Sequence, residues 1–220
     1  MKYKFDIQFF GGRGSSSGGG GASGGLDPSD IVSTTSLISE REGKEREVDD
    51  TLNVLRDVMK EYGVGLEDVQ IATLKGKGIS TMAYYDAGGN LAVNKAYFSS
   101  AKMNSAYDAC VDSGFHPSRG NKTGLEAVVA HEMGHRLNHI AGGNSWEKLD
   151  STAYDIVKKA SKATGYKNAT KEFSAKISGY AKHSYAEAVA EAFADVYCNG
   201  NKASRESRAV VSELNKYFKK

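Results

Sequence analysis

The chain has 220 residues, of which 40% are hydrophobic and 25% are charged. These values are typical of a globular protein that can bury a core without disulfide staples. The formal net charge is only +2, there is no dense basic stripe, and no apolar run approaches the length of a membrane span, so we expect neither nucleic acid nor a membrane as a partner.

The chain begins with two segments that do not read as part of a folded domain. Residues 1–10, MKYKFDIQFF, form a short apolar tag, and residues 11–25 are nearly all Gly and Ser, which predicts a flexible linker. Asp6 and Gln8 interrupt the apolar stretch, so we expect no secretion signal and a cytoplasmic or virion-associated location. The tag could dock onto another protein or form a disordered tail.

Residues 26–220 are predicted to form one domain, with its ordered part starting near Asp30. Within 44–62, apolar residues recur at three- and four-residue steps, which predicts an amphipathic helix that ends at Gly63. Short β-prone runs follow at 69–74, 81–85 and 91–93. The turn-forming sequence DAGGN between the last two predicts a β-hairpin.

Three further helices are predicted in the second half of the chain. The helix over 123–141 starts with a capping box of Thr123 and Glu126 and stops at Gly142-Gly143. An alanine-rich helix over 185–197 closes at Asn199-Gly200. A third, over 204–218, is amphipathic and carries Val210, Val211, Leu214 and Phe218. Together these elements predict an α+β fold with a small mixed sheet and a mainly helical C-terminal half.

The two cysteines, Cys110 and Cys198, are far apart and lack CxxC spacing. We expect two free thiols rather than a disulfide.

The sequence HEMGH at 131–135 lies inside the predicted helix 123–141. Because His131 and His135 are four residues apart, their imidazoles project from the same face, one turn apart. That spacing suits two nitrogens that bind one zinc ion at about 2.0–2.1 Å. Glu132 lies one step round the helix, where it can accept a proton from the attacking water. The motif predicts one Zn²⁺ cofactor, with Glu132 as the general base.

A catalytic zinc ion usually has three protein ligands and one open position, so a third ligand must come from elsewhere. His139 is too far away, because the helix rises about 12 Å between it and His131. We expect His139 to be solvated or otherwise satisfied near the helix end, where its charge suits the helix dipole.

The acids of helix 185–197 are the stronger candidates for the third ligand. Glu187, Glu191 and Asp195 follow at four-residue steps and share one face. Either Glu187 is the ligand with Glu191 supporting a ligand histidine, or Glu191 is the ligand with Asp195 in that role. Glu187 could instead serve only as the capping-box partner of Ser184.

This part of the chain resembles the gluzincin peptidases of the anthrax lethal factor type. In that family a tyrosine is followed after six residues by the zinc-binding glutamate, and a supporting glutamate comes four residues later. In YAKHSYAEAVAE these places are taken by Tyr180, Glu187 and Glu191. The resemblance implies Glu187 as the metal ligand, Glu191 as its support and Tyr180 as the donor to the oxyanion. The aromatic residues usual between the two glutamates are replaced by Ala188 and Val189.

The resemblance is clearest over about 80–200 and implies a zincin-like metallopeptidase fold that hydrolyses peptide bonds in a protein or peptide substrate. The segment AYYDAGGNLAVNKAYF would correspond to the family's edge strand, which pairs with the substrate backbone. Tyr185 and His183 are rivals of Tyr180 as oxyanion donor, because placement rather than residue type identifies such a donor.

The first residues, KFDIQFFGGRGSSSGG, are similar to N-termini of prophage proteins of Gram-positive bacteria, which implies a phage particle as a partner. One alternative is therefore a phage-associated structural or interaction protein that keeps the fold without catalysis. Another is a zinc-stabilised, non-catalytic domain, which needs a fourth protein ligand. The remaining histidines for that place are His116, His139 and His183.

Overall fold

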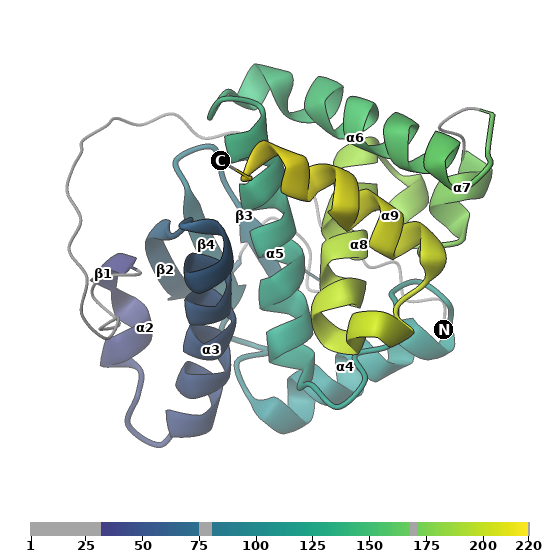
Figure 1. Ribbon diagram of the computed structural model, residues 1–220. Coiled ribbons are helices and arrows are strands. Elements are labelled where there is room, and N and C mark those ends of the chain that lie inside the picture. Colours follow the sequence, from purple (N-terminus) through teal and green to yellow (C-terminus); the bar gives the residue numbers. More distant parts are fainter. Residues whose placement is uncertain (1–31, 75–80, 168–170, 220) are drawn as a thin grey trace. The chain divides into compact units, whose positions relative to one another are not determined.

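The computed structural model describes residues 32–74, 81–167 and 171–219 (Figure 1). The chain divides into two compact units, residues 1–103 and 104–220. The tag, the linker and the expected start of the ordered part near Asp30 lie outside the described residues. Within the described ranges, none of the helices combines the length and the apolar character that a membrane crossing needs.

The first unit contains a four-stranded mixed sheet with the strand order β1-β2-β4-β3. Strand β2 pairs in parallel with β1 and β4, and β3 pairs antiparallel to β4. The strands are β1 (Val32–Thr35), β2 (Leu66–Ala72), β3 (Ala83–Tyr85) and β4 (Asn90–Asn94), and the helices are α2 (Ser36–Ser39) and α3 (Glu45–Tyr62). The predicted small mixed sheet is confirmed.

Helix α3 has the predicted bounds to within one residue. Its apolar face, which includes Val48, Leu52 and Leu55, is buried. The helix ends where Gly63 takes a left-handed conformation at φ 66° and donates its N–H to Met59 O over 2.8 Å, a backbone state that glycine adopts at little cost.

The predicted hairpin is formed by β3 and β4. Its turn is held by Asp86, whose Oδ1 accepts the N–H of Gly88 at 2.8 Å and of Asn90 at 3.1 Å, and Gly89 supplies a positive φ of 86°. Strand β3 lies at the edge of the sheet. The run predicted at 69–74 starts earlier, at Leu66, because β2 pairs with β1 from Leu66 and with β4 from Asp68.

The second unit is helical, as predicted for the C-terminal half. Helix α8 packs against α5, α6 and α9 (Figure 1). The helices are α4 (Ser100–Asp112), which crosses the boundary between the units, α5 (Gly124–Ala141), α6 (Leu149–Ala163), α7 (Lys171–Ala175), α8 (Tyr185–Asn199) and α9 (Arg205–Leu214). Short 3-10 turns include η2 (Tyr180–Lys182) and η4 (Asn215–Tyr217).

The predicted ends of α5 are confirmed, whereas the predicted end of α9 is wrong. The capping box of α5 is present, with Glu126 N donating to Thr123 Oγ1 at 3.2 Å and Thr123 N donating to Glu126 Oε2 at 2.8 Å. At its other end, Gly143 takes the left-handed conformation at φ 76°, whereas Gly142 does not. The predicted helix over 204–218 is too long, because α9 ends at Leu214 and η4 follows.

Helices α5 and α8 lie side by side and approach closely at Gly134 (Figure 1). A Cβ added to Gly134 would lie 2.7 Å from Ala190 Cα, which is closer than real Cβ contacts, and 3.1 Å from Phe193 Cβ, which is a tight contact. The small side chains of α8, among them Ala190, are buried. Glycine on one helix and alanine on the other therefore allow the close spacing that brings polar side chains of the two helices together.

Candidate metal centre

Three side-chain atoms from α5 and α8 converge to form a nearly equilateral triangle. His131 Nε2 lies 3.2 Å from His135 Nε2. Glu187 Oε2 lies 3.2 Å from His131 Nε2 and 3.3 Å from His135 Nε2. All three residues are buried, with exposed fractions of 4%, 1% and 3%. The structure thus brings together the two histidines of HEMGH and the first of the three acids on α8.

The size and chemistry of this triangle fit a metal ion. Ligands at 2.0–2.1 Å from one tetrahedrally coordinated ion lie about 3.3–3.4 Å apart, close to the separations observed. Glu187 Oε2 is buried and has no aligned hydrogen-bond donor among the described residues, so a bound cation would satisfy it. His131, His135 and Glu187 could together hold one metal ion.

Glu191 lies behind His131, on the side away from the triangle. Its Oε1 is 2.8 Å from His131 Nδ1 and 2.9 Å from His116 Nδ1. Its Oε2 accepts a hydrogen bond from Ser178 Oγ at 2.7 Å. A carboxylate against the outer nitrogen of a ligand histidine fixes the orientation and tautomer of the ring. This arrangement corresponds to the register in which Glu187 binds the metal.

Asp195, one turn further along α8, has a different environment. Its Oδ1 accepts from Asn199 Nδ2 at 2.9 Å, and its Oδ2 accepts from Ser204 N at 3.0 Å. Asp195 therefore ties the turn after α8 to the start of α9. The alternative register, in which Glu191 binds the metal and Asp195 supports a ligand histidine, finds no counterpart in these contacts.

Glu187 also lies at the start of α8, where the sequence left a capping role open. Ser184 Oγ accepts the backbone N–H of Glu187 at 3.1 Å, so Ser184 is the N-cap. The carboxylate of Glu187, however, lies beside the two histidines and Tyr180. The backbone N–H of Glu187 thus takes part in the N-cap of α8, while its carboxylate belongs to the triangle.

Tyr180 reaches the triangle from the turn η2. Its hydroxyl donates to Glu187 Oε1 at 3.2 Å, and its ring lies 5.9 Å from the ring of His131. Of its two rivals, Tyr185 packs edge-on against Tyr154 with ring centroids 5.0 Å apart. His183 is exposed and lies 5.1 Å from the Tyr180 ring. The hydrogen bond to Glu187 joins Tyr180 directly to the triangle.

Burial and charge together set the protonation of these groups. Burial lowers the pKa of His131, but the carboxylates of Glu187 and Glu191 outweigh it and hold that pKa well above its ordinary value. Burial raises the pKa of Glu187, yet His135 and His131 hold it far below its ordinary value. Likewise, His116 and His131 overcome burial and lower the pKa of Glu191 to about 2. The ionised carboxylates of Glu187 and Glu191 therefore face the imidazoles, and their negative charge favours the binding of a cation.

Burial, and then the charge of Glu187, raise the pKa of Tyr180 far above its ordinary value. The charge of Glu132 raises it further. Tyr180 therefore stays protonated and remains a hydrogen-bond donor. Glu132 follows His131 on α5 and is 1% exposed, which places the expected general base in the same buried region.

Of the two environments expected for His139, solvated or otherwise satisfied, the first is wrong. His139 is buried rather than solvated, at 2% exposure, and its ring lies edge-on to Trp146 with centroids 5.5 Å apart. Burial, and then the charge of Arg136, lower its pKa, which disfavours the charged form suggested for the helix end. Cys110 and Cys198 are free thiols, as expected, and burial raises the pKa of each to about 12.

His116 and Ser178 are contacts of Glu191 that sequence reasoning missed. A short backbone tie brings their loops together: Gly179 N donates to Gly114 O at 2.8 Å and Tyr180 N donates to Phe115 O at 2.9 Å. His116 also stacks on Tyr107, with centroids 5.3 Å apart and an interplanar angle of 6°. Neither residue belongs to a spacing motif, so no sequence signal indicated its contact with Glu191.

Comparison of the chain with protein-family models, with curated proteins and with solved structures found no match.

Proposed function

We propose that the chain is a zinc-dependent endopeptidase of the gluzincin type with a zincin-like fold. The observation that carries the proposal is the buried triangle of His131 Nε2, His135 Nε2 and Glu187 Oε2, with edges of 3.2 to 3.3 Å. Its two histidines come from an HExxH sequence on one helix, and such a motif on a helix is typical of zinc peptidases. His131, His135 and Glu187 would hold the ion, and Glu191 would orient His131.

When bound, zinc would supply a Lewis acid that lowers the pKa of water and polarises a substrate carbonyl. Glu132 would accept the proton of the attacking water and pass it to the leaving amine. The Tyr180 hydroxyl, held protonated by its surroundings, would donate a hydrogen bond to the oxygen on which negative charge develops.

The ligand set favours a catalytic over a structural ion. A structural zinc site is usually closed by four protein ligands, whereas a catalytic one has three. Among the described residues, the group that could hold a metal has three members. The histidines considered for a fourth place lie elsewhere: Nδ1 of His116 is at Glu191, His139 packs on Trp146, and His183 is exposed. The features that suggested a phage particle, in 1–25, lie outside the described residues.

Zinc content and peptide hydrolysis test the proposal together. We expect about one zinc ion per chain by elemental analysis and cleavage of peptides in an unbiased synthetic library. Glu132→Gln should abolish cleavage while zinc stays bound, because the amide cannot accept the proton. Glu147→Gln, a change of an exposed glutamate after α5, is the matched control and should behave as wild type. Wild-type turnover by Glu132→Gln, or a purified protein with neither zinc nor cleavage, would overturn the proposal.

A further inference from the structure

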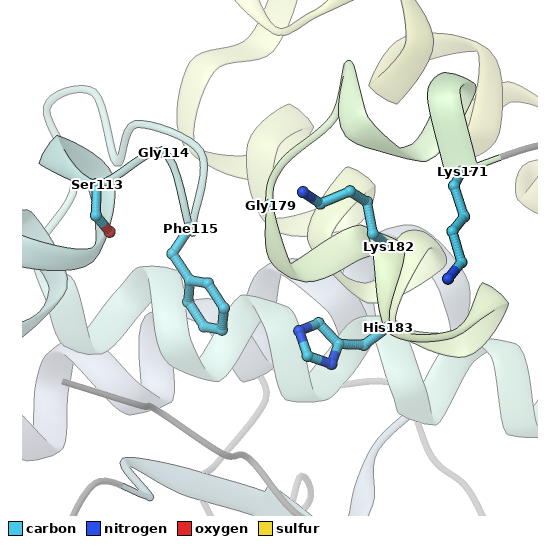
Figure 2. Close-up of a pocket in the computed structure, with 7 residues that line it drawn as sticks. All are labelled: Ser113, Gly114, Phe115, Lys171, Gly179, Lys182 and His183. Carbon is cyan, nitrogen blue, oxygen red and sulfur yellow. The ribbon is translucent and has the colours of Figure 1, made fainter. Parts of the chain in front are cut away.

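A pocket of about 750 Å³ lies in the second unit (Figure 2). Its volume is within the range of about 300–1,000 Å³ that is typical of ligand sites. The residues that line it include Gly114, Phe115, Lys171, Gly179, Lys182 and His183. In Figure 2 the ring of His183 lies beside that of Phe115, and the lysines extend from the segment that contains α7 and η2.

The pocket carries positive charge that no ion pair among the described residues neutralises. Two of its lining side chains, Lys171 and Lys182, are lysines, and none is acidic. Two lysines of this unit have carboxylate partners: Lys122 pairs with Glu126 at 3.0 Å and Lys216 with Glu213 at 2.7 Å. Over the described ranges, by contrast, no ion pair involves Lys171 or Lys182. Such a pocket favours an anionic ligand.

The pocket is linked to the candidate metal centre through one side chain, Tyr180. The rings of Phe115 and His183 lie 4.9 Å and 5.1 Å from the ring of Tyr180. Tyr180 in turn donates to Glu187 Oε1 at 3.2 Å. An extended peptide covers at most about 3.3–3.6 Å per residue, so a chain bound at the metal centre would reach the pocket within a few residues.

We infer that this pocket is a substrate subsite for a carboxylate close to the bond that is cleaved. The inference rests on the proposed peptidase function and adds a substrate class to it. The carboxylate can come from an Asp or Glu side chain or from the C-terminus of the peptide. Lys171 and Lys182 supply the attraction, and the Phe115 ring contacts the methylene groups that carry the carboxylate.

The cleavage test uses two synthetic peptide libraries that differ only in Glu or Gln at one fixed position, each made with a free and with an amidated C-terminus. We expect kcat/KM to be higher for the Glu library, or for the free C-terminus, by about fivefold per pocket lysine, the size of a solvent-screened ion pair. An effect that follows the internal Glu identifies a side chain, and one that follows the free end identifies the terminal carboxylate.

Variants of the pocket lysines make the test specific. Lys182→Gln and Lys171→Gln should each lower the preference for the carboxylate, measured as a ratio of kcat/KM values, by about fivefold. Lys182→Glu should instead favour a library with Lys at the fixed position. Lys176→Gln is the matched control, because Lys176 is exposed in the same segment but does not line the pocket. Equal cleavage by the wild type of Glu and Gln libraries and of free and amidated C-termini would overturn the inference, as would an equal loss in Lys176→Gln.

A binding measurement separates the subsite from the catalytic proposal. Fluorescence anisotropy with the dye-labelled Glu and Gln libraries on the full-length Glu132→Gln chain needs no turnover. If the wild type cleaves nothing but Glu peptides still bind more tightly, by about fivefold per pocket lysine and in a Lys182-dependent way, the pocket stands and the peptidase proposal fails. If cleavage occurs but neither cleavage nor binding distinguishes the libraries, the peptidase proposal stands and the subsite is refuted.

Discussion

Glu187 and Glu191 lie one turn apart on α8, yet their carboxylates have different partners, and this difference predicts different losses on mutation. Glu187→Gln should weaken zinc binding far more than Glu191→Gln, because it removes a ligand rather than the support of one. For Glu191→Gln we expect a loss of about 10–100-fold. Asp195→Asn, the next acid on the same face, should leave affinity unchanged because its partners are Asn199 and Ser204. Competition with a chromogenic chelator measures all three, and the reverse order would place the ligand at Glu191.

We predict that Tyr180→Phe lowers the rate of peptide cleavage without a loss of bound zinc. Tyr180→Phe removes a hydroxyl that donates to Glu187 Oε1, the oxygen outside the triangle, so zinc content should be unchanged. The kcat for peptide cleavage should fall by about 10²-fold, the usual effect of losing one oxyanion donor, with little change in KM. Tyr185→Phe is the matched control, since that ring packs on Tyr154. A larger loss in Tyr185→Phe would reassign the donor.

At the scale of single residues, the sequence predicted those site residues that belong to a spacing pattern. The i, i+4 spacing of His131 and His135 is enough to place two imidazoles on one helix face, and the family resemblance selected Glu187 over Glu191. His116 and Ser178 could not be found in this way. They reach Glu191 from two loops joined by the backbone contacts of Gly114 and Gly179, and such long-range contacts leave no local period in the sequence.

Among the elements, the contact of α5 with α8 decides whether the ligands meet, and Gly134 decides how close the helices lie. We predict that Gly134→Ala lowers both stability and zinc affinity, although alanine is the better helix former by about 1 kcal/mol. The new Cβ would meet Ala190 Cα at 2.7 Å, and a backbone atom cannot move aside as a rotamer can. We expect a net loss of about 1–3 kcal/mol in urea unfolding with chelator present. An unchanged midpoint and unchanged zinc binding would contradict this role of Gly134.

In the first unit, Glu47 of α3 caps the start of α4. Its titration predicts a pH-dependent contribution to the free energy of unfolding. Glu47 Oε1 accepts from Ser100 N at 2.6 Å and from Ser100 Oγ at 2.8 Å. Burial raises the pKa of Glu47, but these hydrogen bonds outweigh it and lower that pKa below its ordinary value of 4.5. Because the folded-state pKa is depressed, the stabilisation is fully present above 4.5 and is lost as the pH falls through the lower folded value.

Glu47→Gln should therefore lower the free energy of unfolding by about 1 kcal/mol at neutral pH, after allowance for solvent screening of this half-buried group. The difference from wild type should shrink as the pH falls below 4.5. Urea denaturation at several pH values, with chelator present throughout, measures it. Glu42→Gln, an exposed change before α3, should show no such profile. A constant difference at every pH would mean that the carboxylate charge does not contribute.

Local signals predicted α3, α5 and α8 well because each has a stop or a cap that physical chemistry makes explicit, such as Gly63 or the Thr123–Glu126 box. Strand pairing was predicted only for β3 and β4, which a short turn connects. The parallel pairing of β2 with β4 was not predicted. It joins residues far apart in the chain, and the bounds of β2 depend on that pairing more than on its own composition.

For the molecule as a whole, the proposed zinc ligands come from α5 and α8, both within 104–220, whereas the sheet belongs to 1–103. An ion that binds the native second unit stabilises it by mass action, by about 2.7 kcal/mol when free zinc exceeds the dissociation constant 100-fold. We predict that zinc added to chelator-treated protein slows amide hydrogen exchange in α5 and α8, and in α6 and α9, which pack on α8. Amides of β2 and β4 should exchange at unchanged rates. Glu187→Gln should show no zinc effect in either unit, and equal protection of both units in the wild type would show that the ion stabilises more than the helices that bind it.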